Sequence, residues 1–238
     1  MSHLVIFDCD GVLVDSETLS AEVMRTMARE LGASFTGDSA LAFIQGRKVA
    51  EWTAELGEMV GRELPEEFVP EFRKRCTDAF DRDLVATDGI EDVLTAMEPP
   101  FCCASSAPMQ KILHVLGHTG LLHFFPEGRL YSAYEVKVWK PDPGLFLHAA
   151  AAHGVPPERC AVVEDSAPGV RAGIRAGMTV FAYAPDGIPA IGEGAGQPGT
   201  SEEPEGHLTT FTSMRELPSL LRRWRSTLPD HTSPLQHP

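Results

Sequence analysis

Short apolar runs alternate along the chain with longer stretches of helical periodicity, and this alternation predicts an α/β fold with a mostly parallel sheet. Continuous apolar runs are typical of parallel strands, because helices cover both faces of such a sheet. We therefore expect a Rossmann-like, doubly wound parallel sheet. The runs predicted to be strands are Leu4 to Phe7, Phe101 to Ala104, Ala161 to Val163, Thr179 to Tyr183 and the shorter Thr209 to Phe211.

The stretch between the first two predicted strands has only helical periodicity. Ser16 is expected to cap a first helix, and Gly32 is expected to end it. Further helical patterns cover Val49 to Val60 and Glu66 to Phe80. Such a stretch is too long for a simple crossover between neighbouring strands, so it predicts an inserted, all-helical cap domain.

These patterns divide the chain into parts. We expect residues 1–15 and 87–225 to form the catalytic core, and residues 16–86 to form the helical cap. The segment 185–206 is rich in Gly, Pro and Glu, which predicts a flexible loop. Residues 226–238 are expected to form a disordered tail.

The chain has 238 residues and a formal net charge of -14. General binding to nucleic acid or to anionic membranes needs a basic surface, so neither is expected to be a partner. A phosphorylated substrate would require a locally positive site. The chain has no apolar run long enough to span a bilayer and no pattern of a signal peptide, so we expect a cytoplasmic protein, as a monomer.

Polar clusters follow three of the predicted strands. They are Asp8 to Asp10, Ser105 to Ser106 and Glu164 to Asp165. Ligands of open α/β sheets bind at the carboxyl ends of the strands, so these clusters predict one shared site. The repulsion between two carboxylates at Asp8 and Asp10 implies a divalent cation, a nearby cationic side chain or a raised pKa. A capping Asp followed by a turn Asp would give the same local pattern.

The run Phe7 to Ser16 resembles the first motif, DxDGT/V-L-x-D, of the haloacid dehalogenase superfamily in its phosphatase branch. The second motif of this family is a Ser or Thr at the end of the next core strand, which Ser105 matches. The third motif, a Lys often followed by Pro, is matched by Lys140. An acidic pair before a Gly-containing turn is the fourth, and the segment Glu164 to Val170 matches it. The resemblance implies a haloacid dehalogenase-like core.

The resemblance also implies a role for each motif residue. Asp8 would attack phosphorus and form an aspartyl-phosphate. Asp10 would protonate the leaving oxygen and later deprotonate the attacking water. Ser105 would donate a hydrogen bond to a phosphoryl oxygen, with Ser106 beside it as a further substrate contact. Lys140 would offset the negative charge shared by nucleophile and phosphate.

A magnesium ion is the cofactor that the resemblance implies. Asp8, the main-chain carbonyl of Asp10 and Asp165 would hold it, since Mg²⁺ prefers hard oxygen ligands. Glu164 is either a further ligand or a residue that anchors the site from behind, and both alternatives stay open.

The expected activity is hydrolysis of a small phosphorylated metabolite. Dehalogenases of this superfamily lack the second Asp of the first motif, so Asp10 favours the phosphatases. The segment 124–143 is similar to bacterial phosphatases of 6-phosphogluconate, which implies a sugar phosphate as substrate.

Two alternatives remain. Sugar phosphomutases of the β-phosphoglucomutase type share the motifs, but carry a cap arginine about where this chain has Val49. Arg47 and Lys48 precede that position and are candidate substrate contacts. A non-catalytic binding protein on the same fold is less favoured, because all four motifs keep their reactive atoms.

Overall fold

The computed structural model describes residues 3–36, 39–44, 47, 49–97, 100–185 and 208–228. Six strands form one sheet in the order β3-β2-β1-β4-β5-β6, and every neighbouring pair is parallel. The predicted doubly wound α/β core is confirmed. The strands are β1 (Leu4–Phe7), β2 (Phe101–Ser105), β3 (Leu130–Ser132), β4 (Cys160–Glu164), β5 (Thr179–Tyr183) and β6 (Leu208–Phe211).

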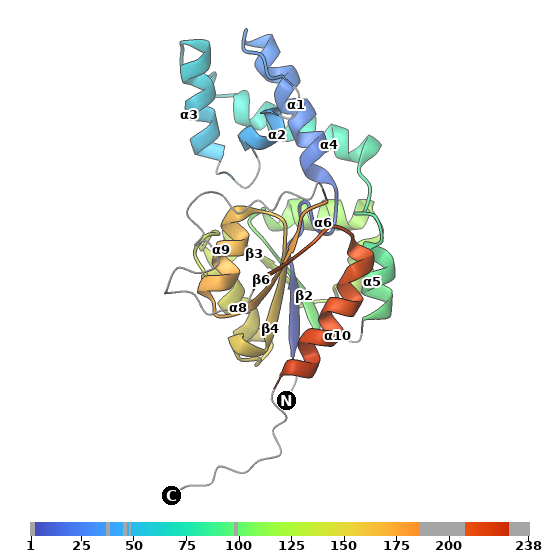
Figure 1. Cartoon of the computed structure of the whole chain (residues 1–238). Coiled ribbons are helices and arrows are strands. Elements are labelled where there is room, and N and C mark those ends of the chain that lie inside the picture. Colours follow the sequence, from blue (N-terminus) through green and yellow to red (C-terminus); the bar gives the residue numbers. More distant parts are fainter. Residues whose placement is uncertain are drawn as a thin grey trace, which may run out of the picture.

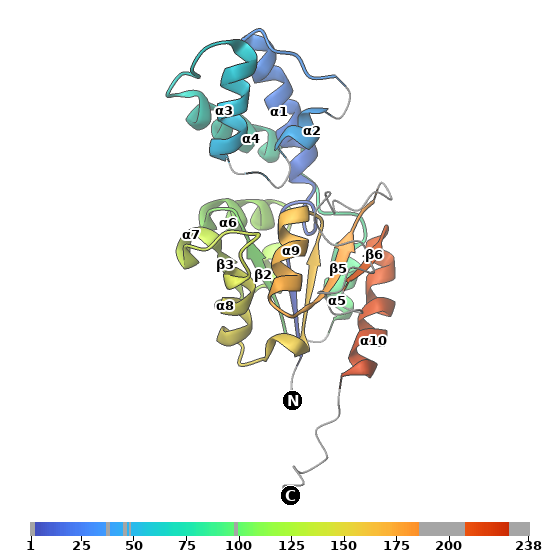
Figure 2. The same ribbon diagram turned by 60° about the vertical axis from the view of Figure 1, so that its left-hand side comes forward.

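Helices cover both faces of the sheet (Figures 1 and 2). One face packs against α5, α6 and α10, and the other against α7, α8 and α9. Short 3₁₀ turns lie at η1 (Leu121–Phe124), η2 (Pro157–Arg159) and η3 (Met214–Glu216). The helices of the two layers are α5 (Ile90–Ala96), α6 (Met109–His118), α7 (Ala133–Val136), α8 (Gly144–Ala152), α9 (Ala167–Arg175) and α10 (Leu217–Thr227).

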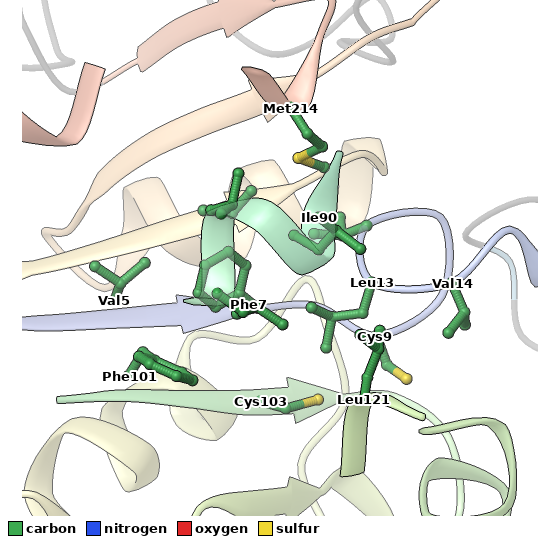
Figure 3. Packing of buried hydrophobic residues seen from close by; sticks show 14 of the residues in the cluster. Val5, Phe7, Cys9, Leu13, Val14, Ile90, Phe101, Cys103, Leu121 and Met214 are labelled. Carbon is green, nitrogen blue, oxygen red and sulfur yellow. The ribbon is translucent and has the colours of Figure 1, made fainter. Parts of the chain in front are cut away.

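Strand β1 lies at the centre of the sheet and is completely buried. Its side chains alternate between the two hydrophobic clusters, because successive residues of a strand point to opposite faces. Val5 and Phe7 join the cluster on the side of α5 and α10, where Phe7 meets Phe101 of β2 edge to face (Figure 3). Leu4 and Ile6 join the cluster on the other face. A rigid central strand therefore leads directly into the Asp8 motif.

Of the five helices described between β1 and β2, the first four lie beyond the carboxyl ends of the strands (Figures 1 and 2). They have a hydrophobic cluster of their own, which includes Met24, Trp52 and Leu56. The predicted helical periodicity is confirmed in this segment, and Gly32 follows the first helix with φ +94. The helices are α1 (Ser16–Glu30), α2 (Ser39–Ile44), α3 (Val49–Val60) and α4 (Phe68–Asp83).

The two connections between the helical segment and the sheet run side by side. The N–H of Asp15 donates to the carbonyl of Val85 at 3.1 Å, and the N–H of Thr87 donates to the carbonyl of Leu13 at 3.0 Å. The chain therefore leaves and re-enters the sheet layer at one place, next to the Asp8 motif.

The prediction that Ser16 caps α1 is wrong. Asp15 holds the N-cap position without a side-chain hydrogen bond, and Ser16 is the first helical residue. The hydroxyl of Ser16 instead donates a short hydrogen bond to Oδ1 of Asp10. The reason is that the chain turns back on itself after Asp10, which brings the start of α1 against that carboxylate.

Two predicted segments fall mostly outside the described residues. Of the expected loop 185–206, the structure describes only residue 185. Helix α10 continues through Thr227, so regular structure extends past the expected start of the tail, and residues 229–238 are not described. Within the described part of the chain, no helix is long and apolar enough to cross a membrane.

Candidate active site

The loop after β1 turns sharply so that Asp8 lies at the carboxyl end of the sheet. The N–H of Asp8 still donates to the carbonyl of Val163 at 3.0 Å, which continues the pairing with β4. Gly11 then adopts φ +78, and its N–H donates to the carbonyl of Val14 at 2.9 Å. A Cβ atom on Gly11 would lie only 2.0 Å from Oδ2 of Asp165. Glycine is therefore required here both by the turn and by the carboxylate beside it.

Lys140 lies between two buried carboxylates. Its Nζ atom is 2.5 Å from Oδ1 of Asp8 and 2.5 Å from Oε1 of Glu164. Burial alone would lower the pKa of Lys140, but the charges of these two carboxylates raise it overall. Burial raises the pKa of Asp8, and the charge of Lys140 opposes this effect. The lysine stays charged and faces the proposed nucleophile.

Glu164 is completely buried, and both of its oxygens are engaged. Oε1 accepts from Lys140, and Oε2 accepts from the N–H groups of Asp165 and Ser166 at 2.9 Å each and from the Ser166 hydroxyl at 3.0 Å. A Cβ atom on Gly169 would lie 1.8 Å from Oε1. The turn into α9 thus encloses Glu164 and fixes the carboxylate that holds Lys140.

Asp10 has a different set of partners from Asp8 and Glu164. Oδ1 of Asp10 accepts from Lys111 at 2.8 Å and from the hydroxyl of Ser16. Burial would raise the pKa of Asp10, but the charge and hydrogen bond of Lys111, with that of Ser16, lower it overall. Lys111 lies six residues beyond Ser105 in the first turn of α6, and it was not predicted from the sequence. A basic side chain on an amphipathic helix carries no signal that distinguishes it from an ordinary solvated lysine.

The second motif is placed as expected. Ser105 ends β2 and is buried, and its hydroxyl accepts from the N–H of Ala107 at 3.0 Å. Ser106 is exposed, and both serines line the cavity that contains Asp8. Ser105 keeps its hydroxyl proton available for a second partner, since it acts as the acceptor in that hydrogen bond.

Two basic residues of the helical segment, Arg47 and Lys48, were predicted as substrate contacts, and the structure describes only the first. Arg47 lines the same cavity, with its guanidinium 2.7 Å from Glu55 and over the ring of Phe43. Lys48 lies outside the described residues.

Three carboxylates form a cluster that could hold a metal ion. One oxygen each from Asp8, Glu164 and Asp165 lies within 4.8 Å of the others. Burial, followed by the nearby carboxylates of Glu17 and Glu164, raises the pKa of Asp165 well above its usual range. Crowded, buried oxygen ligands of this kind fit a hard divalent cation such as Mg²⁺. The side chain of Asp10 is not part of this cluster. Glu17, whose carboxylate lies near Asp165, was not predicted as a site residue from the sequence.

A single cavity of about 1220 Å³ joins the strand ends to the helical segment. Its floor contains the motif residues, and its walls come from α1, α3, α4 and α6 and from the loop that carries Lys140. The exposed rings of Tyr134 and Trp139 pack edge to face at one side, with centroids 5.4 Å apart. The polar and charged residues of the lining are Asp8, Asp10, Ser16, Glu17, Ser20, Arg47, Thr53, Arg73, Thr77, Ser105, Ser106, Gln110, Lys111, His114, Lys140, Asp165 and Ser166.

Comparisons with known proteins agree with this geometry. Residues 3–177 match the family model of the haloacid dehalogenase-like hydrolases. The chain is 34% identical over 229 residues to the 6-phosphogluconate phosphatase of Escherichia coli, covering 94% of this chain and 97% of that protein. It is 30% identical over 178 residues to a phosphorylated carbohydrates phosphatase of Thermotoga maritima, covering 73% of this chain and 81% of that protein.

Solved structures share the fold across nearly the whole chain. A haloacid dehalogenase-like protein of unknown function from Agrobacterium tumefaciens superimposes with a TM-score of 0.79 at 26% sequence identity. That comparison covers 94% of this chain and 100% of the other, so the helical segment is included as well as the sheet.

Proposed function

Because the chain belongs to the haloacid dehalogenase-like hydrolases, we propose that it is a magnesium-dependent phosphatase of small sugar phosphates, with 6-phosphogluconate as the favoured substrate. The observation that carries the proposal is the buried contact of Lys140 with Asp8 beside a cluster of metal-binding type. A carboxylate that attacks a phosphate is repelled by the negative charge of the phosphate, and a nearby cation reduces this repulsion. Lys140 is such a cation beside Asp8. The names of the two similar phosphatases support a phosphorylated carbohydrate as the substrate class.

The first step is attack of Asp8 on phosphorus. A carboxylate oxygen of Asp8 forms a bond to phosphorus as the bond to the leaving oxygen breaks, which produces an aspartyl-phosphate and an alcohol. Asp10, whose pKa is lowered in the free enzyme, would take up a proton when the substrate binds and then supply it to the leaving oxygen. Since Lys111 and Ser16 both contact Oδ1 of Asp10, Oδ2 is the oxygen left to carry that proton.

The second step is hydrolysis of the aspartyl-phosphate. Asp10, now ionised, takes a proton from water, and the oxygen of that water attacks phosphorus. The bond between phosphorus and Asp8 breaks, which releases inorganic phosphate and restores the carboxylate. Lys140 offsets the negative charge on Asp8 and on the phosphoryl oxygens in both steps, and Ser105 donates to one of those oxygens.

Asp8, Asp165 and the main-chain carbonyl of Asp10 would hold the magnesium ion. When bound, the ion supplies positive charge that offsets the repulsion between phosphate and carboxylates. Both oxygens of Glu164 already accept hydrogen bonds, which supports the role of an anchor for Lys140 rather than that of a direct ligand.

The helical segment is proposed to act as a cap, comprising residues 16–86, over a core of residues 1–15 and 87–225. Its helices contribute one wall of the cavity, and Arg47 from the helical segment and Ser106 from the core are candidate substrate contacts. Closure of a cap over the strand ends would exclude bulk water and admit only small substrates. Folded phosphoproteins are therefore expected to be poor substrates.

The test is hydrolysis of a generic aryl phosphate, 6-phosphogluconate and both glucose phosphates with added Mg²⁺. The proposal predicts phosphate release that stops on chelation and that Asp8→Ala abolishes, while circular dichroism shows an unchanged fold. Assaying the interconversion of the two glucose phosphates in the same samples tests the mutase alternative. Phosphate release at a near wild-type rate by Asp8→Ala would refute the assigned nucleophile, and no release from any of these substrates would favour a binding protein.

A further inference from the structure

One basic side chain of the cavity differs from the others in having no acidic partner among the residues that the structure describes. Four other basic side chains line the cavity, and each faces a carboxylate of the protein. The pairs are Lys140 with Asp8 at 2.5 Å, Lys111 with Asp10 at 2.8 Å, Arg47 with Glu55 at 2.7 Å and His114 with Asp81 at 3.1 Å. Arg73 is exposed and lines the same cavity, yet among the described residues no carboxylate lies within ion-pair distance of it.

Arg73 lies on the face of α4 that forms the cavity wall. The other residues of this face recur at helical spacing, and apart from Thr77 they are apolar or a buried thiol: Val69, Phe72, Cys76 and Phe80. Arg73 is thus the one charge on this face of α4. The charge of Arg73 therefore lies along the cavity wall, and no carboxylate in the described ranges neutralises it.

The neighbouring basic residues of α4 show that this arrangement is specific to position 73. Lys74 pairs with Asp78 at 2.8 Å, and it does not line the cavity. Arg75 pairs with two carboxylates, Glu71 at 2.7 Å and Glu30 at 2.6 Å. Among the basic residues that line the cavity, only Arg73 has no carboxylate partner within the described part of the chain.

We propose that Arg73 binds the carboxylate of the substrate, at the end opposite its phosphoryl group, and so selects sugar-acid phosphates over neutral sugar phosphates. This inference rests on the proposed phosphatase function. The phosphoryl group is taken at the strand ends by Lys140 and Ser105, whereas Arg73 comes from a different element on the cavity wall. A guanidinium presents two parallel N–H donors that match a carboxylate, and pairing inside a cavity is screened less than on the surface.

A matched pair of substrates isolates the effect of the substrate carboxylate on kcat/KM. 6-Phosphogluconate and sorbitol 6-phosphate have the same chain of carbons and the same phosphate, and differ in having a carboxylate or a hydroxymethyl group at carbon 1. We expect the wild-type enzyme to have a higher kcat/KM for 6-phosphogluconate. The variant Arg73→Gln should lower that value by about 10- to 100-fold, as for the loss of a charge-assisted hydrogen bond, mainly through KM. It should leave kcat/KM for sorbitol 6-phosphate unchanged.

Lys74→Gln is the matched control, because it removes a neighbouring positive charge of α4 that does not reach the cavity. It should leave both kcat/KM values unchanged. The inference is overturned if Arg73→Gln affects the two substrates equally, if it affects neither, or if the wild-type enzyme does not distinguish them. In all three cases phosphate is still released and the proposed phosphatase function stands. If the wild-type enzyme hydrolyses no phosphoester, the proposed function fails and the inference fails with it.

Discussion

The Nζ atom of Lys140 lies 2.5 Å from Oδ1 of Asp8, and both side chains are almost completely enclosed by the protein. Taking two charges out of water costs free energy that their attraction does not always recover, so a buried ion pair is a poor way to stabilise a fold. The proposed chemistry explains the pair better, because the same lysine can stabilise the charge that develops when Asp8 attacks phosphorus.

Replacing Lys140 by Met should therefore affect both activity and stability. We expect kcat to fall by at least about 100-fold, because a preorganised cation at the reacting group is lost. The free energy of unfolding should fall by about 3–5 kcal/mol, because two buried carboxylates lose their partner. This second loss should be smaller at low pH, where protonation neutralises Asp8, whose pKa is raised by burial. Steady-state kinetics and urea denaturation at two pH values measure both effects, and an active, equally stable variant would contradict the account.

Replacing Lys111 by Gln should raise the pKa of Asp10. In the wild-type protein Lys111 is the largest of the influences that lower this pKa, so Asp10 stays ionised to lower pH than an ordinary Asp. Without the ammonium, burial is opposed only by weaker groups, and Asp10 should become protonated at higher pH. Carboxyl ¹³C NMR of the substrate-free protein measures this titration, with Asp10→Asn to assign the signal.

Lys111→Arg is the control for that experiment. It keeps the positive charge beside Asp10, so the pKa should stay lowered. If Lys111→Gln left the pKa of Asp10 unchanged, the 2.8 Å contact would not be what holds this carboxylate ionised.

Gly169→Ala and Gly117→Ala should have opposite effects. A Cβ atom at position 169 would meet Oε1 of Glu164 at 1.8 Å, and that carboxylate cannot withdraw without breaking its contacts with Lys140 and the turn. We expect a loss of activity and a lower melting temperature. Gly117 lies in α6 with nothing within 4 Å of its Cβ position, so alanine should stabilise the helix by about 0.5–1 kcal/mol. Thermal denaturation of both variants measures these effects. A Gly169→Ala variant with unchanged melting temperature and activity would show that Glu164 is not fixed as described.

The sequence predicted the core of the fold well, because buried parallel strands have a strong apolar signature. Strand β3 was missed, since Leu130–Ser132 has three residues and only Ser132 among them is buried. Helix α2 was missed for a similar reason, as Ser39–Ile44 is too short to show a helical period. In both cases contacts with neighbouring elements, rather than local pattern, determine the structure.

The motif residues of the candidate site could be singled out from the sequence, but the residues that contact them could not. Asp8, Lys140 and Glu164 stand in motifs with fixed neighbours, whereas Lys111, Glu17 and Arg73 lie on ordinary amphipathic helices. Which face of such a helix meets the strand ends depends on how the helix packs. Ser16 was misassigned because a serine at a helix start usually caps it, and only the turn after Asp10 brings its hydroxyl to that carboxylate.

The central claim is that Asp8 becomes phosphorylated during turnover. Quenching the enzyme with acid while it turns over 6-phosphogluconate or an aryl phosphate, followed by borohydride reduction, converts an aspartyl-phosphate to homoserine. Mass spectrometry of the peptide that contains residues 1–25 should then find homoserine at position 8 and unmodified aspartate at position 10. The Asp8→Asn variant should give no modified peptide. Homoserine at another position, or rapid turnover with none at all, would contradict the account.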